Sequence, residues 1–319
     1  MKKQKVVDEL TPIKVKKKSI WKDKNSWSLL LLCLPAIAGY ILFNYIPIAV
    51  SLTIPFRDYK FSKGILDSAF VGVKNFRWIF TSSSMLEIIR NTFLYGLWFM
   101  FLGPITNVIL ALLLFEVRNR KALKAYQTVV TFPNFMSFVV VGFVTYAIFS
   151  PTNGFMNQVL TSLGGNKIDV YTNAGVWPLI LSLVNIWKGI GMGSMMYFAS
   201  LMGIDTSLFE AAEMDGATRW HKMCYISIPH LVPLICIYII LGVEQLVGGN
   251  FDLFYVIPRD VPLLYDTTDI LSTYVYRALA NGTYAMGAAV GLLQSVVGML
   301  LVVIANLIVK KISPDNSLF

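Results

Sequence analysis

Apolar residues along this chain gather in long runs, separated by shorter polar segments. Six runs are each long enough to cross about 30 Å of hydrocarbon as a helix, which takes about 20 residues. We therefore predict an all-α polytopic membrane protein with six transmembrane helices. The predicted spans are Trp27–Pro55, Thr92–Phe115, Ala125–Phe149, Val176–Met202, Ile226–Gly248 and Met286–Val309. Pro104 and Pro133 fall inside two of them and are expected to kink their helices, because proline lacks an amide hydrogen.

Composition supports a membrane protein. Hydrophobic residues make up 56% of the 319 positions and charged residues only 14%, where about 25% charged is ordinary for soluble domains. The net charge of +9 would raise nucleic acid as a partner, but no nucleic-acid-binding motif accompanies it. Nine lysines lie between Lys2 and Lys24, before the first apolar run. We therefore expect no nucleic acid partner. The lysines instead fit a membrane protein whose cytoplasmic segments are enriched in lysine and arginine.

Lysine and arginine set the expected orientation, because cytoplasmic segments carry an excess of them. With the N-terminus inside, the inner segments 1–26, 116–124, 203–225 and 310–319 hold 9, 4, 2 and 2 basic residues. The outer segments 56–91, 150–175 and 249–285 hold 6, 1 and 2. Both termini are therefore predicted to be cytoplasmic in a multi-pass protein of the cell membrane. The chain divides into a lysine-rich tail, 1–26, and a transmembrane domain, 27–319.

The inner segment 203–225 contains a predicted helical hairpin. Ser207 followed by Glu210 has the pattern of a capping box, which marks a helix start. Gly216 is suited to a left-handed turn at the end of that helix. A short helix is marginal alone in water, so we expect it to dock on something. Its candidate apolar contacts are Leu208, Phe209, Ala211, Ala212 and Met214.

One spacing in this hairpin is specific. Glu210-Ala-Ala is followed after three residues by Gly216, and after nine more by Ile226-Ser-Ile-Pro229. This pattern resembles the EAA loop of ABC importer permeases, with isoleucine at 228 where leucine is usual. Phe70-Val-Gly-Val-Lys-Asn-Phe76 is similar to a segment of the carbohydrate-uptake permeases, and 262–277 and 288–298 resemble the subgroup that handles oligo- and polysaccharides.

The resemblance implies a type I ABC importer permease fold with a cytoplasmic coupling helix at about 205–222. It implies that Glu210, Ala211, Ala212, Asp215 and Gly216 couple the permease to a cytosolic ATPase. It further implies a second homologous permease, two ABC ATPase subunits that bind ATP and Mg²⁺, an extracellular solute-binding protein or lipoprotein, surrounding membrane lipid, and an oligosaccharide substrate moved by alternating access.

Catalytic motifs are missing from the sequence. It contains no G-x-x-x-x-G-K-[ST], H-E-x-x-H or G-x-S-x-G, so the chain is not expected to be an enzyme or to bind a cofactor itself. Its three cysteines and two histidines have no metal-ligand spacing. Two alternatives stay open: an ABC permease for a non-sugar solute, and a stand-alone secondary transporter that uses Glu244 for ion coupling.

Polar residues inside the spans are candidates for the substrate path, because such residues are costly in a bilayer and usually mark a functional site. The alternative is a structural role in bonding between helices, including a pair between Lys188 and Glu244. Asn107 and Gln294 are weaker candidates. The outer loop from Asp252 to Arg277 is a candidate surface for the binding protein. The main path candidates are Asn185, Trp187, Lys188, Glu244, Gln245 and Asn250.

Overall fold

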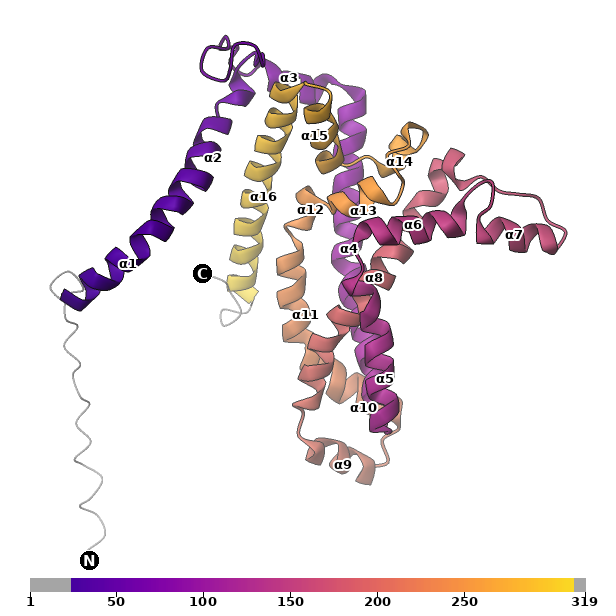
Figure 1. Cartoon of the computed structure of the whole chain (residues 1–319). Helices are drawn as coiled ribbons and strands as arrows, with labels where there is room; N and C mark the ends of the chain where they lie inside the picture. The colour runs from indigo at the N-terminus through magenta and orange to yellow at the C-terminus, as the bar shows by residue number, and fades with distance from the viewer. Residues whose placement is uncertain (1–23, 313–319) are drawn as a thin grey trace, which may run out of the picture. The chain divides into compact units, whose positions relative to one another are not determined.

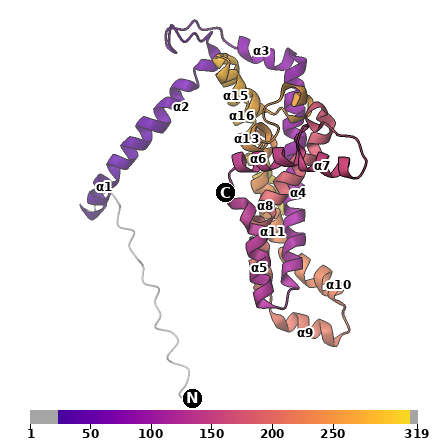
Figure 2. The same cartoon turned by 45° about the vertical axis from the view of Figure 1, so that its right-hand side comes forward.

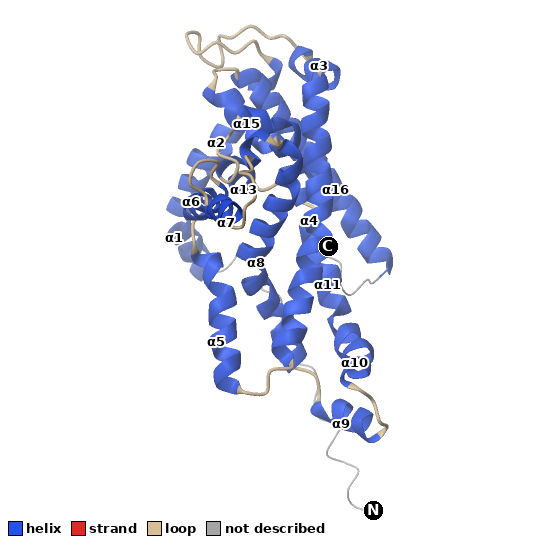
Figure 3. Cartoon of the chain, turned by 90° about the vertical axis from the view of Figure 1, so that its right-hand side faces the viewer, coloured by secondary structure: helices blue, strands red, loops and turns tan. Residues whose placement is uncertain are grey.

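The computed structural model describes residues 24–312 and divides the chain into two units, one ending at Thr53 and one beginning at Ile54. Within the described residues the secondary structure is helical, apart from isolated β-bridges in the loop 57–70 (Figure 3). Five helices are long and apolar enough to cross a membrane, or six if one bent pair counts as a span. The all-α polytopic prediction is therefore confirmed.

The N-terminal unit is a single helical rod. It comprises α1 (Lys24–Tyr40), a π-helical turn (Ile41–Tyr45) and α2 (Ile46–Ser51). No side chain of 27–51 is buried. Its apolar surface therefore has no partner inside the unit, as suits a helix surrounded by lipid or by another subunit.

Four long helices form the frame of the main unit, and α11 runs opposite to the other three (Figure 1). They are α4 (Ser83–Phe115), α8 (Trp177–Met202), α11 (Ile228–Gly242) and α16 (Tyr284–Ile312). The 33 residues of α4 form one uninterrupted helix that passes through Pro104, so this proline does not break its span. Glycines allow close helix packing here: a Cβ built on Gly96 would lie 2.5 Å from Cα of Leu246.

The third predicted span is not one continuous crossing. It consists of α5 (Arg120–Thr131), a 3-10 turn (Phe132–Phe135) and α6 (Phe138–Phe149), and the two arms are bent by 100°. Pro133 lies in the turn, where its missing amide hydrogen ends the first arm. The hydroxyl of Ser137 accepts a hydrogen bond from the Val140 amide at 3.3 Å and starts the second arm. The expected kink is thus a sharp corner.

Short helices complete both ends of the main unit. At one end lie α9 (Thr206–Met214) and α10 (Arg219–Lys222), which continues through a π-helical turn (Met223–Ser227) into α11. The opposite end holds α3 (Lys74–Thr81) and α15 (Leu271–Ala280) (Figure 2). The remaining short helices are α7 (Phe155–Ser162), α12 (Gln245–Gly248), α13 (Phe251–Val256) and α14 (Tyr265–Thr268).

The segment Phe70–Phe76 has a structural role at the α3 end. The side-chain amide of Asn75 donates to the carbonyl oxygens of Pro55 at 2.8 Å and Arg57 at 3.1 Å. The rings of Phe56 and Phe76 lie 5.3 Å apart. Gly72 adopts a φ of +59°, a left-handed conformation that glycine accepts without steric cost. These residues fold the loop back onto the chain entering the main unit.

Candidate functional site

The start of α9 is capped by Asp205, not by the predicted pair of Ser207 and Glu210. The carboxylate of Asp205 accepts a hydrogen bond from the Ser207 amide at 3.0 Å. That hydrogen bond holds the pKa of Asp205 below its usual value. The capping-box prediction was wrong because an extended acid two residues earlier satisfies the free amide first.

Gly216 ends α9 in a left-handed turn, as predicted. Its φ is +77°. The Gly216 amide donates to the Glu213 carbonyl at 3.0 Å, and the Ala217 amide donates to the Ala212 carbonyl at 2.9 Å. These two hydrogen bonds define a Schellman motif. A Cβ built on Gly216 would meet no atom within 4 Å, so the glycine is required for its backbone conformation and not for space within this chain.

One contact holds α9 against the long helices and a second holds it against α10. The ring of Phe209 lies 5.9 Å from that of Phe115 and packs on a core cluster at the foot of α4, α8 and α11. Lys222 forms an ion pair with Glu213, and the hydrogen bond from Lys222 lowers the pKa of Glu213. Of the predicted apolar contacts, Phe209 therefore provides the anchor.

The rest of α9 faces away from the chain. Glu210, Ala211, Asp215 and Gly216 are exposed and Ala212 is half-buried. Met214 is 89% exposed and Trp220, on α10, is 67% exposed. An exposed apolar surface on a rigidly capped helix is typical of a protein-docking site. Trp220 was missed in the sequence because it lies outside the Glu-Ala-Ala pattern.

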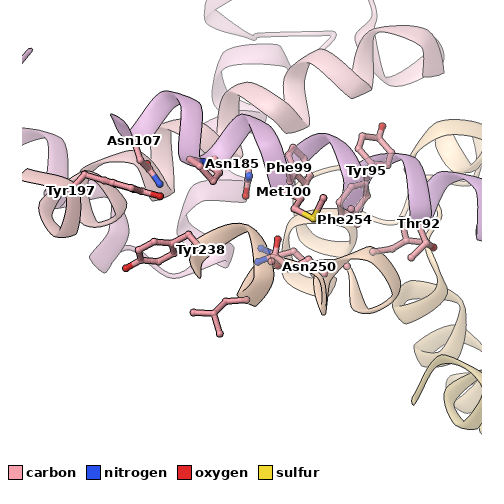
Figure 4. Close-up of a pocket in the computed structure, with 18 residues that line it drawn as sticks. Thr92, Tyr95, Phe99, Met100, Asn107, Asn185, Tyr197, Tyr238, Asn250 and Phe254 are labelled. Atoms are coloured by element: carbon pink, nitrogen blue, oxygen red, sulfur yellow. The ribbon is translucent and has the colours of Figure 1, made fainter. Parts of the chain in front are cut away.

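A second candidate site is a cavity of about 310 Å³ between α4, α8, α11 and the segment around α12 (Figure 4). This volume is at the lower end of the range for ligand pockets, which begins at about 300 Å³. Among the predicted path residues, Asn185, Gln245 and Asn250 line it, and so does Asn107. None of these four was distinguishable from structural polar residues by sequence alone.

Aromatic side chains that the sequence did not single out line the same cavity. Tyr197 and Tyr238 lie at one end with ring centroids 5.4 Å apart. Tyr95, Phe99 and Phe254 form a second cluster, in which the Tyr95 and Phe254 rings are 4.6 Å apart. One sequence feature could have pointed to these residues: a tyrosine inside an apolar span, because its hydroxyl needs a hydrogen-bond partner when buried.

Lys188 has a structural role between helices, but its partner is not Glu244, the alternative that the sequence left open. Its ammonium donates to the carbonyl oxygens of Met136 at 2.7 Å and Asn134 at 3.0 Å. These carbonyls belong to the corner between α5 and α6, where the helix break leaves acceptors without helical partners. Lys188 therefore has a structural role in satisfying the corner. It does not line the cavity, and neither do Trp187, Glu244 and Gln294.

Several charged residues of the loop 252–277 pair with other residues of the same loop. Arg277 forms ion pairs with Asp269 and, at 3.2 Å, with Asp260. Tyr265 donates a hydrogen bond to Asp260 at 2.9 Å, and burial raises the pKa of Tyr265 to about 12. Asp269 is only 5% exposed. These residues brace the loop, which leaves fewer free charges for a partner than the sequence suggested.

No cluster of metal-ligating side chains occurs among residues 24–312.

A family model described as "Binding-protein-dependent transport system inner membrane component" matches residues 103–314. The polygalacturonan/rhamnogalacturonan transport system permease protein YteP of Bacillus subtilis is 32% identical over 290 residues, which cover 90% of this chain and 89% of that protein.

Solved structures give the same result. A bacterial ABC transporter involved in the import of the acidic polysaccharide alginate matches with a TM-score of 0.83 and 30% identity, over 93% of this chain and all of that chain. A second structure, the bacterial alginate ABC transporter in complex with its alginate pentasaccharide-bound periplasmic protein, matches with a TM-score of 0.82 and 30% identity, over 93% of this chain and 99% of that chain.

The fold and the comparisons together define a class, the permease component of an ABC importer. The chain belongs to the family of binding-protein-dependent transport system inner membrane components. It is a multi-pass inner-membrane transport component and not itself an enzyme. Family membership excludes the stand-alone secondary transporter that the sequence had left open.

Proposed function

We propose that this chain is one of two homologous permease subunits through which an oligosaccharide enters the cell. In this proposal two ABC ATPases bind ATP and Mg²⁺ and dock on the permeases. An extracellular solute-binding protein or lipoprotein delivers the sugar. The permease domain, 27–319, is embedded in lipid, and both termini, including the tail 1–26, are cytoplasmic.

One observation carries the coupling part of this proposal. The helix α9 is held by Phe209 on one face and exposes Ala211, Met214 and the Gly216 turn on the other. Small alanines permit close approach of a partner, and a fixed turn transmits a push without bending. Glu210, Ala211, Ala212, Asp215 and Gly216 are the proposed ATPase contacts. Closing of the ATPases would then tilt the helices that α9 joins, α8 and α11.

The oligosaccharide part rests on the cavity and on the relatives. Sugars present hydroxyl groups and an apolar C–H face, which amides and aromatic rings recognise. The cavity offers both kinds of side chain. Relatives at 32% and 30% identity are named for polysaccharide transport. A glycerol-3-phosphate permease of Salmonella typhi is less similar, at 26% identity, so a non-sugar solute is the second candidate. We propose Asn185, Gln245 and Asn250 as path residues.

The test is uptake by the assembled transporter. Proteoliposomes that contain both permeases and both ATPases should import oligosaccharide only with external binding protein and internal ATP. Reporters fused after Asp205 should be cytoplasmic, and reporters within 152–173 should be external. Uptake without ATP, or the reverse reporter pattern, would contradict the proposal. The matched control is an ATPase variant that binds ATP without hydrolysing it.

A further inference from the structure

The cavity contains no charge. Figure 4 shows the 18 residues that line it, and none is Asp, Glu, Lys, Arg or His. Two ionisable groups of neighbouring helices lie elsewhere: the ammonium of Lys188 is bound to backbone carbonyls at the α5–α6 corner, and Glu244 is outside the lining. A carboxylate that entered this cavity would meet no cation from the described chain.

The polar groups of the cavity are neutral, and two of its buried hydroxyls, those of Tyr95 and Tyr197, have no hydrogen-bond partner among the described residues. Tyr197 is 1% exposed, and its hydroxyl has no hydrogen-bond partner among the described residues. In Figure 4 Tyr197 lies at the end of the cavity that also holds Tyr238, and their ring centroids are 5.4 Å apart. Buried hydroxyls and amides are nearly always hydrogen-bonded in folded proteins. An unpartnered tyrosine hydroxyl that lines a cavity therefore indicates a ligand that brings its own hydroxyl groups.

The aromatic side chains of the cavity suit the apolar C–H face of a sugar ring. The Tyr95, Phe99 and Phe254 rings pack together with centroid separations of 4.6 to 6.3 Å. Aromatic surfaces of this kind accept the C–H face of a pyranose ring. The amides and the aromatic rings of the cavity together therefore match an uncharged sugar unit, whose polar groups are all hydroxyls or amides.

From this lining we infer that the cavity is a subsite for an uncharged sugar unit and that it discriminates against uronates. The inference rests on the proposed function and specifies its substrate class. It departs from the relatives whose names or titles give polygalacturonan and alginate. The physical reason is that desolvating a carboxylate without a cation or strong donors is far more costly than desolvating a hydroxyl, which two amides can pair.

The experiment compares sugars that differ only in this charge. The assembled transporter in nanodiscs, without binding protein, is equilibrated with two radiolabelled pairs: galactotetraose against tetragalacturonate, and mannotetraose against tetramannuronate. Omitting the binding protein removes that protein's own selectivity. In at least one pair the neutral member should be retained at least about tenfold more tightly, because an unpaired buried charge costs more than an unpaired hydroxyl.

Variants assign the discrimination to this cavity. Tyr197→Phe should weaken retention of the neutral sugar about two- to tenfold, the usual value of one hydrogen bond. It should leave thermal stability unchanged, because the hydroxyl has no partner in the chain. Tyr171→Phe is the matched control, since Tyr171 is also buried with an unpartnered hydroxyl but lies outside the cavity. Asn185→Lys should shift the preference toward the uronates.

Three results would overturn the inference. Equal or tighter retention of both uronates would do so while leaving the proposed function intact. Equal effects of Tyr197→Phe and Tyr171→Phe would show that the hydroxyl in the cavity has no special role. Retention of no sugar in either pair would remove the cavity from the path. Failure of the proposed function itself would appear separately, as loss of ATP-dependent uptake with binding protein present.

Discussion

Replacing Gly216 by valine should uncouple the ATPases from this permease without unfolding it. Gly216 is the left-handed residue of the Schellman motif that ends α9, with φ of +77°. Its own amide and that of Ala217 close the turn on the carbonyls of Glu213 and Ala212. Valine, branched at Cβ, is strongly disfavoured in this conformation. The perturbation therefore acts on the turn alone.

The size of the effect follows from the backbone. A non-glycine residue held in the left-handed region costs about 1–3 kcal/mol, and a β-branched residue lies toward the upper limit. No atom lies within 4 Å of a Cβ built at this position, so steric clashes within the chain do not add to this cost. If docking requires the turn, each 1.4 kcal/mol weakens binding about tenfold, and the total is about 5- to 150-fold.

The assay is titration of the purified ATPase onto permease complexes in nanodiscs, with sugar uptake measured in parallel. Membrane insertion should be unchanged, because the apolar runs that drive it are untouched. Gly216→Asn is the matched control, since asparagine tolerates the left-handed conformation and should retain most of the binding.

Two results would refute this reasoning. Wild-type ATPase binding and transport by Gly216→Val would show that α9 is not the coupling helix. An equally large loss with Gly216→Asn would show that side-chain size against the partner, and not the backbone turn, determines docking.

Three further predictions concern stability, each read from thermal unfolding of the purified protein. Lys188→Met should lose about 1.5–3 kcal/mol, the value of hydrogen bonds to a charged group, while Lys188→Arg keeps donors for the corner; equal unfolding temperatures for both would contradict the capping role. Gly191→Ala should cost at least about 1–3 kcal/mol, because its Cβ would lie 1.9 Å from the Val130 carbonyl oxygen, whereas Gly189→Ala has open space; similar behaviour of these two would rule out the close α5–α8 packing. Arg277→Met should cost about 3–5 kcal/mol by leaving a buried carboxylate unpaired, and adding Asp269→Asn should recover part of the loss; no recovery would mean that the ion pair is not the cause.

Some features of this chain are local and were readable without the structure. The long apolar runs predict spans because a helix is the one way for a single segment to satisfy its backbone in lipid. The Gly216 turn was predictable because left-handed backbone strongly favours glycine. The cap of α9 was not, since Asp205 and Ser207 are both good caps and only the backbone angles of Asp205 decide between them.

The identity of the cavity residues was decided only in three dimensions. Every face of an apolar span looks alike in sequence, so nothing local distinguished Asn185, which lines the cavity, from its neighbour Trp187, which does not. The lining brings together Asn107, Tyr197 and Tyr238, which come from three different helices.

By itself, the sequence determined the order of the apolar segments and the glycine turn that ends α9, because backbone hydrogen bonding and left-handed geometry are local constraints. Tertiary structure decided the sharpness of the α5–α6 corner and the role of Lys188. The carbonyls of that corner are satisfied by a lysine 52 and 54 residues further along the chain. A charge inside a span can pair, line a path or cap a broken helix, and only the packing of the helices determines which acceptors it reaches.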